Sequence, residues 1–263
     1  MDLKLKNKVI VVTGGSKGIG GGIVSLLARE GAIPVIIGRN RESIHGAIAN
    51  YIKKGFEVGH AFAELTNPKQ CEQAVESIIQ KYGRIEGLVN NAGVNDGIGL
   101  ENGSYDAFMY SIKRNLAHYY HIAQLVLPEL KIAKGAIVNI GSKTSLTGQG
   151  GTSGYAASNG GRNALTREWA VELLPFSVRV NCVIVAECNT PQYEKWIKSF
   201  ENKDEKLAII TEKIPLENRL TTTEEIANTV AFLLSECSSH TTGQLIHVDG
   251  GYTHLDRALK NSS

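Results

Sequence analysis

The chain is poor in cysteine: among its 263 residues there are Cys71, Cys182, Cys188 and Cys237. They form no C-x-x-C pair, and a chain of this length buries enough surface to fold without disulfides. We therefore expect reduced, packed thiols and no metal site. His118 and His121 stand three residues apart, but because no third ligand is near them in the sequence, a surface or subunit contact is the expectation for both.

The sequence also lacks a long apolar run and a strong excess of charge. No window approaches the roughly 18 apolar residues of a membrane-spanning helix, and the first residues show no signal-peptide pattern. The 28 basic and 26 acidic side chains leave a net charge of +2. This balance gives no reason to expect nucleic acid or an anionic membrane as partner. We expect a cytoplasmic protein that acts on a small molecule.

What the sequence does contain is an alternation of short Val- and Ile-rich runs with amphipathic stretches. The expected strands are 8–13, 33–37, 57–61, 87–90, 136–140, 178–183 and 244–248, and the expected helices are 18–29, 41–54, 68–82, 105–130, 154–173 and 223–234. Runs that are apolar on both faces and separated by helices indicate a parallel sheet covered on both sides. The sequence therefore predicts a single α/β domain with a doubly wound, parallel, seven-stranded sheet of the Rossmann type.

One long stretch, residues 186–220, interrupts this alternation. It holds two short amphipathic pieces, at 193–200 and 205–213. An insertion of this length after a late strand favours a substrate lid over a second domain.

A glycine-rich segment, Thr13-Gly-Gly-Ser-Lys-Gly-Ile-Gly20, follows the first expected strand and opens a helix. In that position Gly14 permits a tight turn, Gly18 lets the backbone approach a pyrophosphate, and Gly20 lets helix and strand pack closely. The helix N-terminus offers unpaired N–H groups to phosphates. The segment predicts a dinucleotide site.

Four further features follow the glycine segment along the chain: Asn90-Asn91-Ala92-Gly93, Asn115, Ser142 and Tyr155-Ala-Ala-Ser-Asn159. Together with the glycine segment they resemble the short-chain dehydrogenase/reductase family over nearly the whole chain. The resemblance implies an NAD(P)-dependent oxidoreductase that assembles as a homotetramer. The cofactor contacts that it implies are Gly14, Ser16, Lys17, Gly18, Ile19, Gly20, Arg39, Glu64, Leu65, Asn91, Ala92, Gly93, Tyr155, Asn159 and Thr190.

The resemblance also implies the catalytic residues. Ser142 holds the substrate oxygen, Tyr155 exchanges the proton, and Asn115 positions a water in the proton relay. A phenol loses its proton only near pH 10 in water, so the family places a lysine four residues after the tyrosine to stabilise the phenolate. This chain has Asn159 there, which can reach ribose hydroxyls but carries no charge. Two nearby cations, Arg162 and Lys143, are candidates for compensating it.

Cofactor preference is predicted from the end of the second strand. NAD-binding members place an acidic residue there for the ribose 2′-hydroxyl, whereas this chain has Gly38 followed by Arg39. Arg39 and Lys17 are suited to a 2′-phosphate, so we expect NADP, with NAD as the alternative. The alternative is that Arg39 and Lys17 are solvated side chains of surface loops with no role in cofactor binding.

The substrate side most resembles L-fucose dehydrogenase-like members, on the segments 95–99, 142–144, 147–150, 186–187 and 250–257. Polar residues fall where strands end, as a polyol requires: Asn95, Gln149 and Glu187, beside Ser142 and Tyr155, are the expected substrate contacts. The alternatives are a 3-oxoacyl reductase and a weakly active or non-catalytic nucleotide-binding protein that lost turnover with the lysine.

Overall fold

The computed structural model describes residues 2–255, and within them a seven-stranded sheet forms the centre of the fold. Its strands are β1 (Val9–Thr13), β2 (Ile33–Gly38), β3 (Gly59–Phe62), β4 (Gly87–Asn90), β5 (Ala136–Ser142), β6 (Arg179–Val185) and β7 (Leu245–Val248). All neighbouring strands pair in parallel, in the order β3-β2-β1-β4-β5-β6-β7. The predicted single-domain Rossmann-type α/β fold is confirmed.

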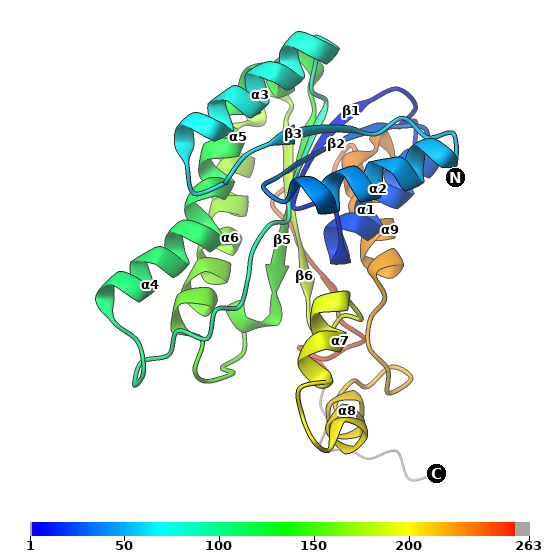
Figure 1. The fold of residues 1–263 in the computed structure, drawn as a ribbon. Coiled ribbons are helices and arrows are strands. Elements are labelled where there is room, and N and C mark those ends of the chain that lie inside the picture. The colour runs from blue at the N-terminus through cyan, green and yellow to red at the C-terminus, as the bar shows by residue number, and fades with distance from the viewer. Residues whose placement is uncertain (1, 256–263) are drawn as a thin grey trace.

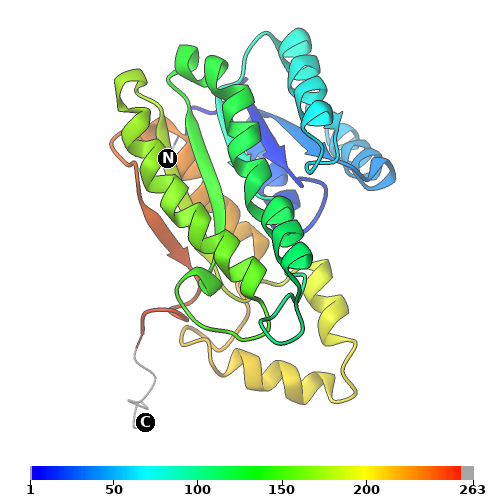
Figure 2. The same ribbon diagram turned by 90° about the vertical axis from the view of Figure 1, so that its left-hand side faces the viewer.

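Helices cover both faces of this sheet (Figures 1 and 2). One layer holds α1 (Gly18–Arg29), α2 (Arg41–Lys53) and α9 (Thr223–Leu234); the other holds α3 (Pro68–Tyr82), α4 (Tyr105–Ile112), α5 (His118–Ala133) and α6 (Ser153–Glu172). Two further helices, α7 (Pro191–Ile197) and α8 (Lys203–Thr211), lie beyond the carboxyl ends of the strands. They occupy the stretch that the sequence sets apart at 186–220.

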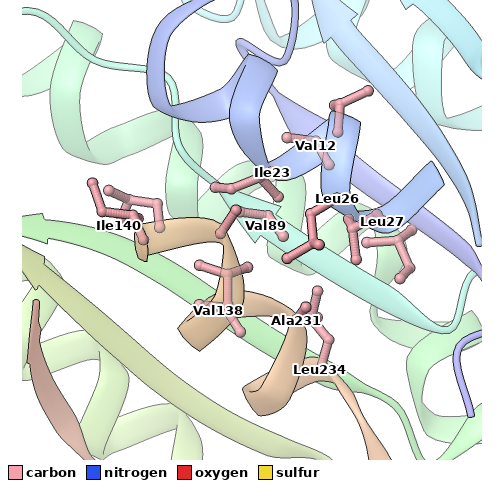
Figure 3. Packing of buried hydrophobic residues seen from close by; sticks show 14 of the residues in the cluster. Val12, Ile23, Leu26, Leu27, Val89, Val138, Ile140, Ala231 and Leu234 are labelled. Atoms are coloured by element: carbon pink, nitrogen blue, oxygen red, sulfur yellow. The ribbon is translucent and has the colours of Figure 1, made fainter. Parts of the chain in front are cut away.

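The sheet is held by two apolar cores, one under each helix layer. In the first, Ile23 and Leu27 of α1 meet Val12 of β1, Val138 of β5 and Leu234 of α9 (Figure 3). All five are fully or almost fully buried. Since burying such a side chain contributes roughly 1.5–3 kcal/mol, this packing fixes where each strand ends and therefore where the polar loops meet.

The chain departs from the predicted elements most clearly at the long helix expected over 105–130. A π-helical turn, Lys113–Ala117, separates α4 from α5. Such a turn widens the backbone spiral and is common at functional positions. Here it contains Asn115, whose carbonyl oxygen accepts hydrogen bonds from outside its own helix. Side-chain periodicity does not report this change, because the apolar pattern continues through the turn.

Candidate active site

The glycine loop adopts the shape that the spacing of its glycines predicts. Gly14 and Gly18 have φ values of +67° and +59°, a region that favours glycine. A Cβ at Gly20 would collide with the carbonyl oxygen of Gly14. The N-terminus of α1 therefore opens directly onto a cradle that a phosphate fits and that side chains would fill. The residues present suit a dinucleotide.

The Asn90–Gly93 segment ties the end of β4 to the end of β1. The Asn91 amide nitrogen donates to the carbonyl oxygen of Thr13 at 2.9 Å, and its backbone N–H donates to the Thr13 hydroxyl at the same distance. Asn90 lies deeper and donates to the Asn139 side chain of β5 at 3.1 Å. These bonds fix the floor of the site next to the glycine loop.

A cleft of about 540 Å³ runs along the carboxyl ends of the strands. The residues predicted for the cofactor that line it are Gly14, Ser16, Lys17, Gly18, Ile19, Gly20, Arg39, Glu64, Leu65, Asn91, Ala92, Gly93, Tyr155 and Thr190. Thr190 caps α7, where its hydroxyl accepts a hydrogen bond from the Tyr193 N–H at 3.1 Å. The start of α7 thus faces the glycine loop.

Ser142 and Tyr155 both line this cleft. Ser142 is the last residue of β5, and its hydroxyl oxygen accepts from the Thr144 N–H at 3.3 Å. Tyr155 stands in the first turn of α6 and is half-buried. The structure therefore brings the predicted serine and tyrosine to one wall, one from a strand end and one from a helix start.

Asn159, which the resemblance makes a catalytic residue and a cofactor contact, is buried in α6. Its side chain is fully buried and does not line the cleft. The amide nitrogen donates to the Tyr155 carbonyl oxygen at 2.9 Å, and Oδ1 accepts from Arg162 Nη1 at 2.9 Å. Both ends of the amide are thus bonded inside the protein, and the contact of Asn159 with a ribose stays a prediction.

Arg162 is the cation that reaches the cleft in its place. Its side chain is 3% exposed, and the guanidinium carbon lies 6.0 Å from the centre of the Tyr155 ring. From the sequence, Arg162 was one of two cations that could compensate for the missing lysine. Its helical spacing from Tyr155 predicts that both residues lie on the same face of the helix. The spacing could not predict that a carbonyl oxygen of the π-helical turn accepts the hydrogen bonds of Arg162.

That acceptor is the backbone of Asn115. Its carbonyl oxygen accepts from Arg162 Nε at 2.9 Å and from Nη2 at 2.5 Å, so both lone pairs are used. The Asn115 side chain accepts from the Val94 N–H at 2.7 Å and is fully buried. The relay water that the resemblance assigns to Asn115 stays a prediction, and in the structure the backbone of this residue holds the Arg162 side chain.

His118 corrects an expectation for the surface. It is 2% exposed and lies at the inner wall of the cleft, where the ring nitrogen Nε2 pairs with the Arg114 carbonyl oxygen at 2.9 Å. Burial, together with the charge of Arg162, lowers the pKa of His118 to about 3. The ring is therefore neutral at working pH. The first turn of α5 faces inward here, toward the sheet, and this explains the burial.

At the opposite end of the cleft, Arg39 and Glu64 form an ion pair, with Nη1 and Oε2 2.7 Å apart. Burial raises the pKa of the Glu64 carboxyl, but hydrogen bonds from Arg39 and Thr66 outweigh it, so the pKa lies below its ordinary value. The Arg39 side chain is 66% exposed. The predicted ligand of a 2′-phosphate thus already has an anionic partner, which the sequence did not reveal.

The predicted substrate residues are spread more widely. Asn95 lines the cleft beside Ser142 and Tyr155, whereas Gln149 is exposed outside it. Glu187 follows β6 and pairs with the buried ammonium of Lys143, the residue after Ser142, and neither of the two is among the residues that line the cleft. In the related 250–257 segment, Tyr252 packs its ring against that ammonium, while Asp256 and Arg257 lie outside the described residues.

Comparison with known proteins agrees with this geometry. The sequence model of a family described as Enoyl-(Acyl carrier protein) reductase matches residues 14–253. The 3-oxoacyl-[acyl-carrier-protein] reductase FabG of Thermotoga maritima is 34% identical over 250 residues, covering 95% of this chain and 99% of the relative. The chain belongs to the short-chain dehydrogenase/reductase family.

Two solved structures extend the comparison of this short-chain oxidoreductase. The Cj0485 dehydrogenase is 47% identical, with a TM-score of 0.93 and coverage of 99% of both chains. The L-sorbose reductase of Gluconobacter frateurii, solved with NADPH and L-sorbose, is 25% identical with a TM-score of 0.92, covering 97% of this chain and 100% of that one.

Residues 2–255 of this short-chain oxidoreductase contain no group of three His, Cys, Asp or Glu side chains that is placed to hold a metal. Of the helices in that range, none is long and apolar enough to cross a membrane.

Proposed function

We propose that this short-chain dehydrogenase/reductase is an NADP-preferring enzyme that oxidises a hydroxyl of a small sugar or polyol, with an L-fucose-like 6-deoxyhexose favoured. The observation that carries the proposal is the Lys143–Glu187 pair next to Ser142. A charged pair one residue from Ser142 suits a substrate with several hydroxyls, because each hydroxyl can donate to a carboxylate and accept from an ammonium.

The chemistry assigns one task to each residue at the reaction end of the cleft. A bound nicotinamide supplies the hydride acceptor. Ser142 donates a hydrogen bond to the substrate oxygen and holds it near Tyr155. The phenolate oxygen of Tyr155 takes the hydroxyl proton as the carbinol carbon loses its hydride and becomes a carbonyl carbon. Asn95 and Glu187 orient the remaining hydroxyls.

Support for NADP comes from the charges at the other end. Lys17 is exposed in the glycine loop, and no carboxylate of residues 2–255 lies within ion-pair distance of it. Arg39 lines the same cleft and is paired with Glu64. An arginine fork binds a phosphate with two parallel hydrogen bonds, so a 2′-phosphate has two cations to meet. The sorbose reductase noted above was solved with NADPH.

A second candidate function is reduction of a 3-oxoacyl thioester. The specific observation in its favour is the 34% identity to the Thermotoga maritima reductase of that name. An acyl chain needs an apolar trough, however, and the pair beside Ser142 is charged.

An assay of pentoses and 6-deoxyhexoses, each with NADP and NAD, tests the proposal against acetoacetyl thioester reduction. Turnover of a 6-deoxyhexose with NADP at the highest kcat/KM supports it. Higher kcat/KM for the thioester would replace it with the second function. Tight cofactor binding without turnover of either substrate class would favour a non-catalytic protein.

Three further features belong to this proposal. Residues 186–220, with α7 and α8, form a lid over the substrate end of the cleft.

Exposed Tyr105, Tyr110 and Tyr120 on α4 and α5 support a homotetramer, because aromatic side chains are enriched at subunit contacts. A cytoplasmic location accords with four unpaired cysteines.

A further inference from the structure

Arg162 is a buried cation whose hydrogen-bond partners are all neutral. Its donors reach the carbonyl oxygens of Asn115 and Ile140 and the side-chain oxygen of Asn159, at 2.5 to 3.0 Å. Among residues 2–255, no carboxylate lies within ion-pair distance of it. A charge held away from water without a counter-charge is destabilised, so a negative charge that forms within reach of Arg162 is stabilised in return.

Tyr155 is the group that can form this negative charge at the cleft. Three other titratable groups surround Arg162, and burial keeps each of them neutral. It raises the pKa of Tyr119, whose hydroxyl donates to the Ile140 carbonyl oxygen, and raises that of the Cys182 thiol to about 12. It lowers the pKa of His118 to about 3. Tyr155, in contrast, is half-buried and lines the cleft with Arg162.

Lys143, the other candidate cation, is already neutralised. Its ammonium is bonded to the Glu187 carboxylate and lies 4.0 Å from the centre of the Tyr252 ring. The field of such a pair falls off faster than that of a single charge, because the two charges oppose each other. Within residues 2–255, Arg162 has no carboxylate at ion-pair distance to oppose its charge.

We propose that Arg162 is the electrostatic partner of the Tyr155 phenolate, and that Asn159 positions the Arg162 guanidinium for this role. Asn159 thus acts as the clamp for a cation about one helical turn further along α6. A guanidinium keeps its protons in proteins, so Arg162 acts through its charge and does not carry the proton. This inference rests on the proposed oxidation step, in which Tyr155 takes the hydroxyl proton.

The first test needs neither cofactor nor substrate, so it is independent of which substrate the enzyme uses. The ultraviolet absorbance of tyrosinate is titrated with pH in the apoprotein and in its Tyr155→Phe variant, and the difference reports Tyr155. In an Arg162→Met background we expect this difference signal to move to higher pH by about one unit or more, the effect of losing a nearby opposite charge.

Asn159→Asp separates the electrostatic role from a structural one. Aspartate keeps the size of asparagine and holds the guanidinium at least as firmly, but its carboxylate balances the positive charge. We expect the Tyr155 signal to move to higher pH in this variant too. If Asn159 were merely a structural clip, the signal would stay in place, and this outcome would overturn the proposal even if Arg162→Met failed to fold.

A matched control is available in Arg179, a second arginine that donates only to neutral oxygens, those of Leu233, Ser235 and Ser238. Arg179→Met should lower thermal stability and leave the Tyr155 signal unmoved. An equal shift in the Arg179 and Arg162 variants would contradict the proposal. The double variant Asn159→Lys/Arg162→Met, which moves the cation back by one turn, should restore the signal toward its original pH. With an assayed substrate, the pH–rate profile should follow the same order.

Discussion

The two ends of the cleft each contain an arginine, and the two are held in opposite ways. Arg39, at the nucleotide end, is 66% exposed and paired with the Glu64 carboxylate. Arg162, at the reaction end, is 3% exposed, and its partners within the described part of the chain are all neutral oxygens. Solvent and a counter-charge weaken the field of the first, whereas burial preserves the field of the second. Position in the fold, and not residue type, decides what each arginine can do.

The two arginines differ in exposure because their partners come from different places in the fold. Arg39 and Glu64 follow neighbouring strands, β2 and β3, so their loops meet at the sheet edge in water. Arg162 is on α6, directly opposite the π-helical turn at Asn115, and the two elements pack against each other. An arginine at the edge can exchange its partner for a ligand, whereas a buried arginine keeps the partners that surround it.

The largest effect is expected from placing a second cation beside Arg162. Asn159→Lys removes the acceptor of Arg162 Nη1 and buries an ammonium next to the guanidinium. We expect a loss of about 3–5 kcal/mol in the free energy of unfolding, which lowers the melting temperature by roughly 10 °C. Calorimetry measures it. A melting temperature equal to that of the parent protein would mean that Arg162 is not where the structure places it.

The companion variant Asn159→Lys/Arg162→Met sharpens this result. Removal of one of the two cations should recover most of the lost stability, although the single changes are each destabilising. Such non-additivity is the expected sign of two groups in contact. If the losses simply add, the two positions do not interact.

An intermediate effect is expected for Glu187, which follows β6 and, like Arg39, belongs to a charge pair. Glu187→Ala removes a charged hydrogen bond of about 1.5–3 kcal/mol from substrate binding, so KM for the sugar should rise ten- to a hundredfold. The exposed Gln149 provides a comparison, and Gln149→Ala should change KM less. Steady-state kinetics with an identified sugar decides between them. An unchanged KM in the Glu187 variant would assign Glu187 to the lid alone.

A smaller effect is expected at the nucleotide end. Arg39→Ala should weaken NADP binding by about tenfold and leave NAD binding nearly unchanged, because NAD has no phosphate at that position. Glu64→Gln should do the reverse and tighten NADP, since it releases Arg39 from its carboxylate. Titration of both cofactors by protein fluorescence measures this. Tighter binding of NAD than of NADP by the parent protein would exclude the proposed preference.

The sequence predicted the sheet, its helices and most of the cleft wall, because glycine geometry and strand-end polarity are local properties. The backbone conformation of the loop that contains Gly14, Gly18 and Gly20 depends on these glycines themselves and not on distant contacts. The orientation of Asn159 was not predictable in the same way. It depends on Arg162, and Arg162 depends on a carbonyl oxygen some 47 residues earlier in the chain. Long-range backbone contacts of this kind leave no pattern in a single sequence.

The smallest effect concerns acid stability at the nucleotide end. The pKa of Glu64 lies below its ordinary value in the folded protein, so the unfolded chain binds the proton more readily. The Arg39–Glu64 pair therefore contributes stability fully at pH values above about 4.5, and this contribution is lost as pH falls through the lower, folded pKa. Because the pair is largely exposed, its contribution is of the order of 0.5 kcal/mol after solvent screening.

Glu64→Gln should accordingly lower the melting temperature by about one or two degrees at neutral pH, and the two proteins should converge in acid. Raising the salt concentration at neutral pH should also close the gap, since the pair is exposed to ions. Thermal melts without cofactor at several pH and salt values measure both trends. A gap that persists in acid and in high salt would mean that Glu64 stabilises the loop by packing and by its bonds to Thr66, and that Arg39 is available to a phosphate without competition.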